Sequence, residues 1–246
     1  GITVTPTSGL ITTEAGGTTS FTVVLNSQPT AGVVIGLSSN DATEGTAGPA
    51  SLTFTAANWN VAQTVTVTGV DDFVVDGSIV YTIITAAAVS TDAGYSGLDA
   101  VDASVTNTDN DAVGITVTPT SGLITTEAGG TATFTVVLNS QSTADVSIAL
   151  SSSDATEGAV GPASLTFATA NWNTPQIVTI TGVDDFVVDG DIAYNIITAA
   201  AVSGDSNYSG FNAADVAVSN TDNDSAGVIV TPTSGLITTE AGGTDT

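Results

Sequence analysis

The segment Thr64-Val65-Thr66-Val67-Thr68 alternates strictly between threonine and valine. Neighbouring side chains of an extended strand point to opposite faces, so the valines are expected to face a core and the threonines to face solvent. A partial alternation of the same kind occurs in Phe21-Thr22-Val23-Val24-Leu25. Both patterns predict strands with one buried face.

Outward from this segment, β-branched runs separated by turn residues fill residues 1–113, and none has helical spacing of its apolar residues. Gly, Asn, Asp and Pro mark the connections, as at Gly16-Gly17, between Asn40 and Pro49, and at Asp76-Gly77. Seven short strands in one domain predict an all-β, two-sheet antiparallel sandwich of the immunoglobulin-like kind. The predicted strands are 2–5, 18–25, 33–38, 51–55, 63–68, 79–85 and 101–106.

The chain repeats itself with a period of 113 residues, and about three quarters of the positions are identical in the two full copies. Gly1–Gly17 returns unchanged as Gly114–Gly130 and nearly unchanged as Gly227–Gly243. The last segment is too short to bury a core alone, so we expect it to continue into a longer chain or to pair with a neighbour. The predicted domains are repeat 1 at 1–113, repeat 2 at 114–226, and the first strand region of an incomplete third repeat at 227–246.

The charge balance is extreme, with 25 Asp plus Glu and no Lys, Arg or His. Without cationic side chains the chain has no means of neutralising phosphates, so we expect no nucleic-acid partner. No apolar stretch approaches the length that spans a bilayer, so we expect no membrane insertion in this segment. The absence of Cys and His excludes the usual zinc, copper, haem and iron-sulfur sites. Hard cations with oxygen ligands remain, and Ca²⁺ is the predicted cofactor.

Most acids of repeat 1 lie in the connections between predicted strands. The densest run is Asp71-Asp72-Phe73-Val74-Val75-Asp76-Gly77, and Asp109-Asn110-Asp111 closes the repeat. Alternate turns of a sandwich meet at one end, so these acids are expected to converge there. Since Ca²⁺ takes roughly six to eight oxygen ligands, the pattern predicts calcium at the end of each sandwich, near the junction of the repeats.

A simpler interpretation is that Asp and Asn form ordinary turns and that surface acids provide solubility. That interpretation accounts poorly for the complete absence of Lys and Arg, which also solubilise. It also accounts poorly for three acids within the single turn from Asp71 to Asp76.

Four segments of repeat 1 together resemble a Calx-beta domain: Glu14-Ala-Gly-Gly before Phe21-Thr-Val-Val-Leu25, Ser51-Leu-Thr-Phe54, Thr64 through Asp72, and Asp109-Asn-Asp111. The resemblance spans essentially each whole repeat and is greatest to the repetitive type of bacterial surface proteins and adhesins. It implies a seven-stranded sandwich that binds calcium at one end. By position it implies the metal ligands Glu14, Asp41, Asp71, Asp72, Asp76, Asp109 and Asp111, with Glu44 as an additional candidate, and in repeat 2 Glu127, Asp154, Asp184, Asp185, Asp189, Asp222 and Asp224.

Two departures separate the chain from the related exchanger domains. Asn110 lies between the last two aspartates, where the exchanger domains have a denser acidic run, and Asp76 stands where a longer acid is common. These departures imply fewer ions at each end, or weaker binding.

The repeats favour a noncatalytic structural array of an extracellular or cell-surface adhesin, stalk or filament, stiffened by calcium at domain ends and junctions. Its expected partners are neighbouring repeats and other copies in a filament. Ser and Thr are abundant, but no His, Lys or Cys is present to activate them, so we expect no enzyme.

Two alternatives remain open at this point. Trp59 and Trp172, at equivalent positions, could stack on a surface glycan, although one such residue beside a strand more often packs against the core or an edge. Alternatively, the partial third repeat could add a strand to another chain and so polymerise the protein.

Overall fold

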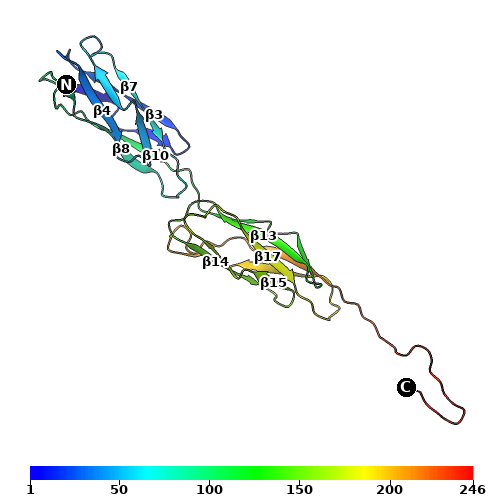
Figure 1. The fold of residues 1–246 in the computed structure, drawn as a ribbon. Helices are drawn as coiled ribbons and strands as arrows, with labels where there is room; N and C mark the ends of the chain where they lie inside the picture. Colours follow the sequence, from blue (N-terminus) through cyan, green and yellow to red (C-terminus); the bar gives the residue numbers. More distant parts are fainter. Residues whose placement is uncertain (246) are drawn as a thin grey trace.

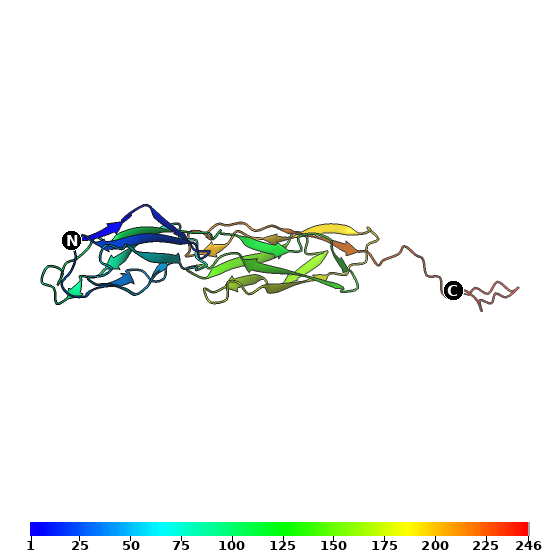
Figure 2. The same cartoon turned by 90° about the horizontal axis from the view of Figure 1, so that it is seen from above.

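The computed structural model describes residues 1–245, which form two sandwich domains arranged end to end and a C-terminal extension (Figures 1 and 2). Repeat 1 contains β1 to β10, and repeat 2 contains β11 to β20 in the same order. The predicted fold class, tandem all-β sandwiches, is confirmed. Within residues 1–245, no helix is long and apolar enough to cross a membrane.

Each repeat pairs a four-stranded sheet with a six-stranded one. In repeat 1 the smaller sheet has the order β1 (Ile2–Thr5), β3 (Thr18–Leu25), β7 (Gln63–Gly69) and β5 (Gly45–Gly48). The larger has the order β2 (Leu10–Thr13), β10 (Ala103–Thr108), β8 (Ile79–Thr85), β4 (Val33–Ser39) and β6 (Ser51–Phe54), and β9 (Val89–Ser90) also pairs with β4.

Repeat 2 reproduces both sheets in the same order. Its smaller sheet contains β11 (Ile115–Thr118), β13 (Thr131–Leu138), β17 (Gln176–Gly182) and β15 (Gly158–Gly161). Its larger sheet contains β12 (Leu123–Thr126), β20 (Val216–Thr221), β18 (Ile192–Thr198), β14 (Val146–Ser152) and β16 (Ser164–Phe167), with β19 (Val202–Ser203) against β14.

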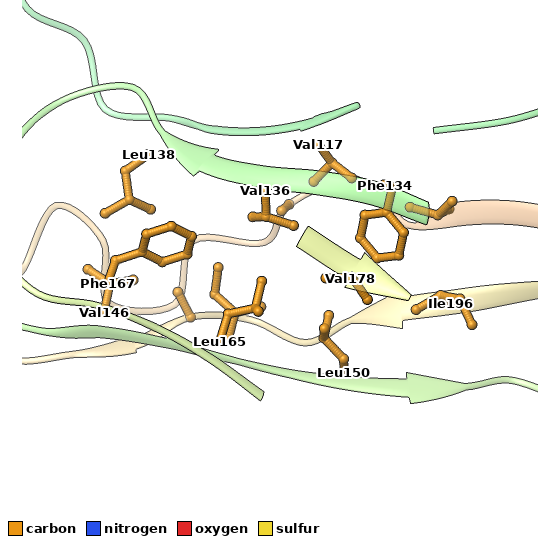
Figure 3. Packing of buried hydrophobic residues seen from close by; sticks show 14 of the residues in the cluster. Val117, Phe134, Val136, Leu138, Val146, Leu150, Leu165, Phe167, Val178 and Ile196 are labelled. Atoms are coloured by element: carbon orange, nitrogen blue, oxygen red, sulfur yellow. The ribbon is translucent and has the colours of Figure 1, made fainter. Parts of the chain in front are cut away.

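The alternation seen in the sequence corresponds to the two faces of the sheet. Val65 and Val67 in β7 are buried, whereas Thr64 and Thr66 are exposed. Val178, the equivalent of Val65 in repeat 2, packs with residues from both sheets, as Figure 3 shows. Each repeat therefore has its own core between its two sheets, which fixes the positions of the connecting loops at the ends.

The prediction of seven strands was too low, because each repeat has ten. The N-terminal strand is interrupted at Pro6–Gly9, after which β2 joins the opposite sheet in parallel with β10, so the sandwich is not wholly antiparallel. β5 forms inside the loop that was predicted to be a turn, where it pairs with β7 at the edge of the smaller sheet. The last strand lies at Ala103–Thr108 instead of 101–106.

The segment from Gly227 to Asp245 forms no named strand, and in the described part of the chain no strand pairing joins residues 227–244 to either sandwich. It retains a local turn, closed by a bridge between Thr239 and Gly243, that matches the turns at Thr13–Gly17 and Thr126–Gly130. Figures 1 and 2 show the segment leading away from the end of repeat 2.

Gly45 is required by a close approach of β5 to a buried tyrosine. A Cβ atom at Gly45 would collide with the Tyr81 side chain, whose hydroxyl lies 3.1 Å from Thr12 Oγ1. We expect Gly45→Ala to lower the free energy of unfolding of repeat 1 by about 1–3 kcal/mol, measured by urea denaturation. The control is Gly36→Ala, which makes only an ordinary contact with Ala86 and reproduces the alanine found at Ala149. Equal effects of the two substitutions would contradict the prediction.

Candidate metal centres

Two groups of three carboxylates lie at the end of repeat 1 that faces repeat 2. In each group, one oxygen from every residue lies within 4.8 Å of the others. The Glu14 group consists of Glu14, Asp109 and Asp111, and the Glu44 group consists of Glu44, Asp72 and Asp76.

The Glu14 group forms because β2 and β10 run in parallel. Thr13, the last residue of β2, is opposite Thr108, the last residue of β10, so the residues that follow both strands emerge side by side. Glu14 N donates to the Thr108 carbonyl oxygen at 3.2 Å, and the Glu14 carboxylate accepts from Asn110 N at 3.0 Å. The Glu14 side chain is only 2% exposed. The sheet topology therefore places a buried carboxylate against the closing aspartates of the repeat.

The aspartates of this group are held by backbone donors. Asp109 accepts from Asp111 N at 2.7 Å and from Gly77 N at 2.8 Å, which ties the end of β10 to the β7–β8 loop. Asp111 Oδ2 is buried without a hydrogen-bond partner, and so is the equivalent Asp224 Oδ2 in repeat 2. A buried carboxylate oxygen without a donor is costly, and a cation would satisfy it. The unpartnered oxygen of Asp111 is therefore the structural evidence that these residues fit a metal ion.

The Glu44 group is held by a series of side-chain hydrogen bonds that begins at the buried residue Thr12. Thr12 Oγ1 donates to Asn107 Oδ1 at 3.0 Å, and Asn107 Nδ2 donates to Glu44 Oε2 at 3.3 Å and to the Val70 carbonyl oxygen at 3.0 Å. Glu44 is 6% exposed. Asp72 accepts from Val74 N at 2.7 Å, which fixes the start of the β7–β8 loop.

Burial and mutual repulsion disfavour the ionised form of several of these acids. Burial raises the pKa of Glu14 to about 6; the hydrogen bond from Asn110 opposes the rise, and the charges of Asp109, Asp72 and Asp111 add to it. Burial likewise raises the pKa of Glu44, and Asp72 is among the charges that raise it further. Because Asp72 acts on a member of each group, the two groups form one electrostatic unit.

The pKa values of Asp111 and Asp76 are raised for the same reasons. Burial raises the pKa of Asp111, followed by repulsion from Asp109, Asp71, Asp72 and Asp76. Burial also raises the pKa of Asp76, again with neighbouring aspartates adding to the effect. A divalent cation would reverse this balance, because its charge favours ionised ligands.

Repeat 2 has the same arrangement at its own far end. The Glu127 carboxylate accepts from Asn223 N at 2.8 Å, and Asn220 Nδ2 donates to Glu157 Oε2 at 3.3 Å. One difference is Asp191, which replaces Ser78 and accepts from Asp222 N at 3.3 Å. The two groups are Glu127, Asp222 and Asp224, and Glu157, Asp185 and Asp189.

The structure places most of the implied ligands in these four groups, but two pairs lie outside them. Asp41 Oδ1 accepts from Thr43 N at 3.1 Å and from Thr43 Oγ1 at 2.5 Å; these two hydrogen bonds close a local turn and lower the pKa of Asp41, as happens at Asp154. Asp71 Oδ1 accepts from Asn110 Nδ2 at 3.2 Å, and Asp184 does the same with Asn223. The grouped residues from the implied set are Glu14, Asp72, Asp76, Asp109, Asp111, Glu127, Asp185, Asp189, Asp222 and Asp224.

Glu44, which the resemblance implied only as an additional candidate, and its equivalent Glu157 both belong to these groups. Their position three residues after Asp41 and Asp154 was visible in the sequence. Their burial was not, because it depends on β5 forming directly after them.

The loop that carries Asp72 and Asp76 also contacts repeat 2. The Phe73 carbonyl oxygen accepts from Gln141 N at 2.6 Å, and Asn207 Nδ2 donates to the Val75 carbonyl oxygen at 2.9 Å. The Phe73 ring lies 5.6 Å from the ring of Trp172, centroid to centroid. The candidate metal centre and the joint between the repeats therefore share one loop.

Comparisons with known proteins give only distant likenesses. No family model and no curated protein matches the chain. Among solved structures, the calcium binding domain pair CBD12 of CALX1.1 has a TM-score of 0.38 and 14% identity, covering 82% of this chain and 80% of that one. The apo form of the Calx CBD1 domain has a TM-score of 0.35 and 18% identity, covering 46% of this chain and 98% of that one. The periplasmic chaperone SfaE has a TM-score of 0.34 and 11% identity, covering 89% and 99% respectively.

The raised pKa values predict an unusual pH dependence without metal. A carboxyl whose pKa is higher in the folded state than in the unfolded state makes folding more favourable as the pH falls through that interval. For Glu14 the interval runs from 4.5 to about 6. In chelator, Tm should therefore rise as the pH is lowered from 7 to 5. Differential scanning calorimetry measures this change.

The matched variant for this experiment is Glu14→Gln combined with Glu127→Gln, because the pKa of Glu127 is also raised. Its hydrogen bond from Asn223 lowers that pKa, but burial and the neighbouring aspartates outweigh the bond. The double variant should show a smaller rise in Tm on acidification. With saturating calcium the trend should reverse, since protons then compete with the ion. A Tm in chelator that falls from pH 7 to pH 5 would contradict the prediction.

Proposed function

We propose that the chain is a noncatalytic structural repeat array of an extracellular or cell-surface adhesin, stalk or filament, stiffened by Ca²⁺ at the end of each repeat. The observation that carries this proposal is the shared loop. Asp72 and Asp76 belong to the Glu44 group, and the residues between them, Phe73 to Val75, hold repeat 2. A cation bound there would act on the joint as well as on the domain.

The bound ion would supply positive charge and oxygen coordination to carboxylates that otherwise repel. The residues of this chain hold the loop in place. Asp109 holds Gly77 N at the C-terminal side of the loop, and the Asp72 carboxylate holds Val74 N at its start. With both ends of the loop fixed, Phe73 keeps its place against Trp172 and the two repeats keep one orientation.

The array character also supports a mechanical role. The two repeats have the same carboxylate groups at the same end, so each added unit would present the same site to the next. The glycan alternative is less well supported at Trp172, because that ring is partly buried against the core and contacts Phe73.

Calcium should stabilise the fold through these carboxylates. Binding to the folded state alone adds about 2.7 kcal/mol per site at a free concentration about 100 times Kd, which raises Tm by several degrees. We expect this rise in scanning calorimetry with calcium relative to chelator. Asp111→Asn should reduce the rise, because Asp111 Oδ2 has no other partner. The control is Asp99→Asn. Asp99 is exposed and lies outside the carboxylate groups, and its equivalent in repeat 2 is Asn212. An identical Tm in calcium and chelator would exclude the metal function.

Calcium should also stiffen the joint. In small-angle scattering, the full chain should have a narrower distribution of maximum dimensions with calcium than with chelator. Phe73→Ala should broaden the distribution even in calcium, because it removes the ring contact with Trp172 and leaves the carboxylates unchanged. The control is Phe186→Ala, the same substitution at the equivalent position of repeat 2, which lies away from this joint. If chelator and Phe73→Ala both leave the scattering unchanged, the joint does not depend on this loop.

A further inference from the structure

A buried asparagine side chain lies between the segments that carry the carboxylates of repeat 1. Asn107 belongs to β10 and is 1% exposed. Its amide nitrogen donates to Glu44 Oε2 at 3.3 Å and to the Val70 carbonyl oxygen at 3.0 Å. Val70 N in turn donates to the Glu44 carbonyl oxygen at 3.0 Å. The Asn107 amide therefore ties the residue before β5 to the residue after β7.

The place of Asn107 in the sequence extends this tie to both carboxylate groups. Glu44 is itself a member of the Glu44 group, and Val70 is followed two residues later by Asp72 of the same group. Asn107 is followed two residues later by Asp109 of the Glu14 group. One side chain thus holds together three segments that carry grouped carboxylates.

The neighbours of Asn107 determine which way its amide points. The Val70 carbonyl oxygen can only accept a hydrogen bond, so the amide nitrogen must lie on that side. On the other side, Thr12 Oγ1 donates to Asn107 Oδ1 at 3.0 Å. Because the Thr12 hydroxyl has one proton, the Tyr81 hydroxyl, 3.1 Å away, is the donor in its contact with Thr12. The donors therefore run in one direction, from the Tyr81 hydroxyl to the Glu44 carboxylate.

The backbone of β7 leaves room for this amide because Gly69 has no side chain. A Cβ atom at Gly69 would collide with Asn107 Oδ1. In repeat 2, Gly182 makes the same close approach to Asn220 Oδ1, and Asn220 Nδ2 donates to the Val183 carbonyl oxygen at 3.1 Å. In both repeats, hydrogen bonds and this steric contact together define the orientation of the amide.

We propose that Asn107, and Asn220 in repeat 2, are positioning residues of the metal centres. Each holds a glutamate and the start of the neighbouring acidic loop in the arrangement that binds the ion. This inference rests on the proposed calcium function. Both residues act through the ligands that they orient, as hydrogen-bond partners of metal ligands generally do. An amide that merely filled space would leave calcium affinity unchanged when a side chain of the same shape replaced it.

The test is Asn107→Leu, because leucine has nearly the same branched shape and no hydrogen-bonding group. Isothermal titration calorimetry measures calcium binding to the full chain. The variant leaves Asn220 and the centre of repeat 2 unaltered, so every molecule contains its own reference. Calcium should bind repeat 1 about 10- to 100-fold more weakly than in the native chain, and repeat 2 with the native affinity. Asn220→Leu should weaken binding at repeat 2 instead.

The matched control is one substitution made at two buried threonines, Thr12→Val and Thr85→Val. Both residues are 1% exposed. Thr85 Oγ1 donates to the Ala100 carbonyl oxygen at 3.2 Å, and Thr85 ends β8, whereas the acidic loop precedes the start of β8. Both variants should lower Tm, because each loses buried hydrogen bonds. Only Thr12→Val, which removes the donor to Asn107 Oδ1, should weaken calcium binding at repeat 1.

The folded state of each variant is established before the titration. Circular dichroism identifies a temperature at which every variant is fully folded, so that a lower Tm does not by itself change the calcium affinity. If Asn107→Leu does not fold, Thr12→Val takes its place, since it acts on the same amide without removing it.

The outcomes separate this inference from the proposed function. Weaker binding in Asn107→Leu and Thr12→Val, with native binding in Thr85→Val, supports the positioning role, and weakening confined to Asn107→Leu supports it for the asparagine alone. Native affinity in Asn107→Leu, or equal weakening in all three variants, overturns the positioning role and leaves the calcium function standing. If Thr12→Val takes its place, native affinity there overturns it likewise. A native chain that binds no calcium overturns both.

Discussion

The repulsion between carboxylates without a cationic partner is the constraint on which the rest of this structure depends. The chain has 25 acids and no Lys, Arg or His, yet Glu14 and Glu44 are almost completely buried. Buried charges ordinarily persist only when they are paired or coordinate a metal. Here backbone N–H groups and one amide satisfy some of the oxygens, and Asp111 Oδ2 remains without a donor. A cation bound at this end would satisfy that oxygen and relieve the repulsion.

The fold creates this constraint through one topological feature. If the N-terminal strand continued unbroken in the smaller sheet, Glu14 would not follow a strand parallel to β10. The change of sheet at Pro6–Gly9 makes β2 and β10 end together, and so brings residues 14 and 109 to the same point. Asn107, near the end of β10, connects the buried Thr12 to Glu44. Hydrogen bonds therefore link the buried side of β2 to the Glu44 group.

The sequence predicted the features that depend on local pattern. Alternation at Val65 and Val67 identified the buried face, and the acidic turns identified the end where carboxylates gather. It did not predict β5, because Gly45-Thr-Ala-Gly48 has turn composition and forms a strand only when the edge of β7 is available. The burial of Glu44 follows from that pairing, so it could not be predicted without the fold.

The contact of Phe73 with Trp172 illustrates a deeper limit of sequence reasoning. The loop from Asp71 to Gly77 and its copy have identical sequences, but one is covered and the other is exposed. Phe73 contacts Trp172 of the neighbouring repeat, whereas residues 1–245 include no ring contact of Phe186, and no local pattern contains this difference. The contact is heterologous, because the loop of repeat 1 meets a different surface of repeat 2. The apolar residues inside the acidic loop therefore serve two purposes: they separate the carboxylates that would hold an ion, and they provide the surface on which the next repeat is oriented.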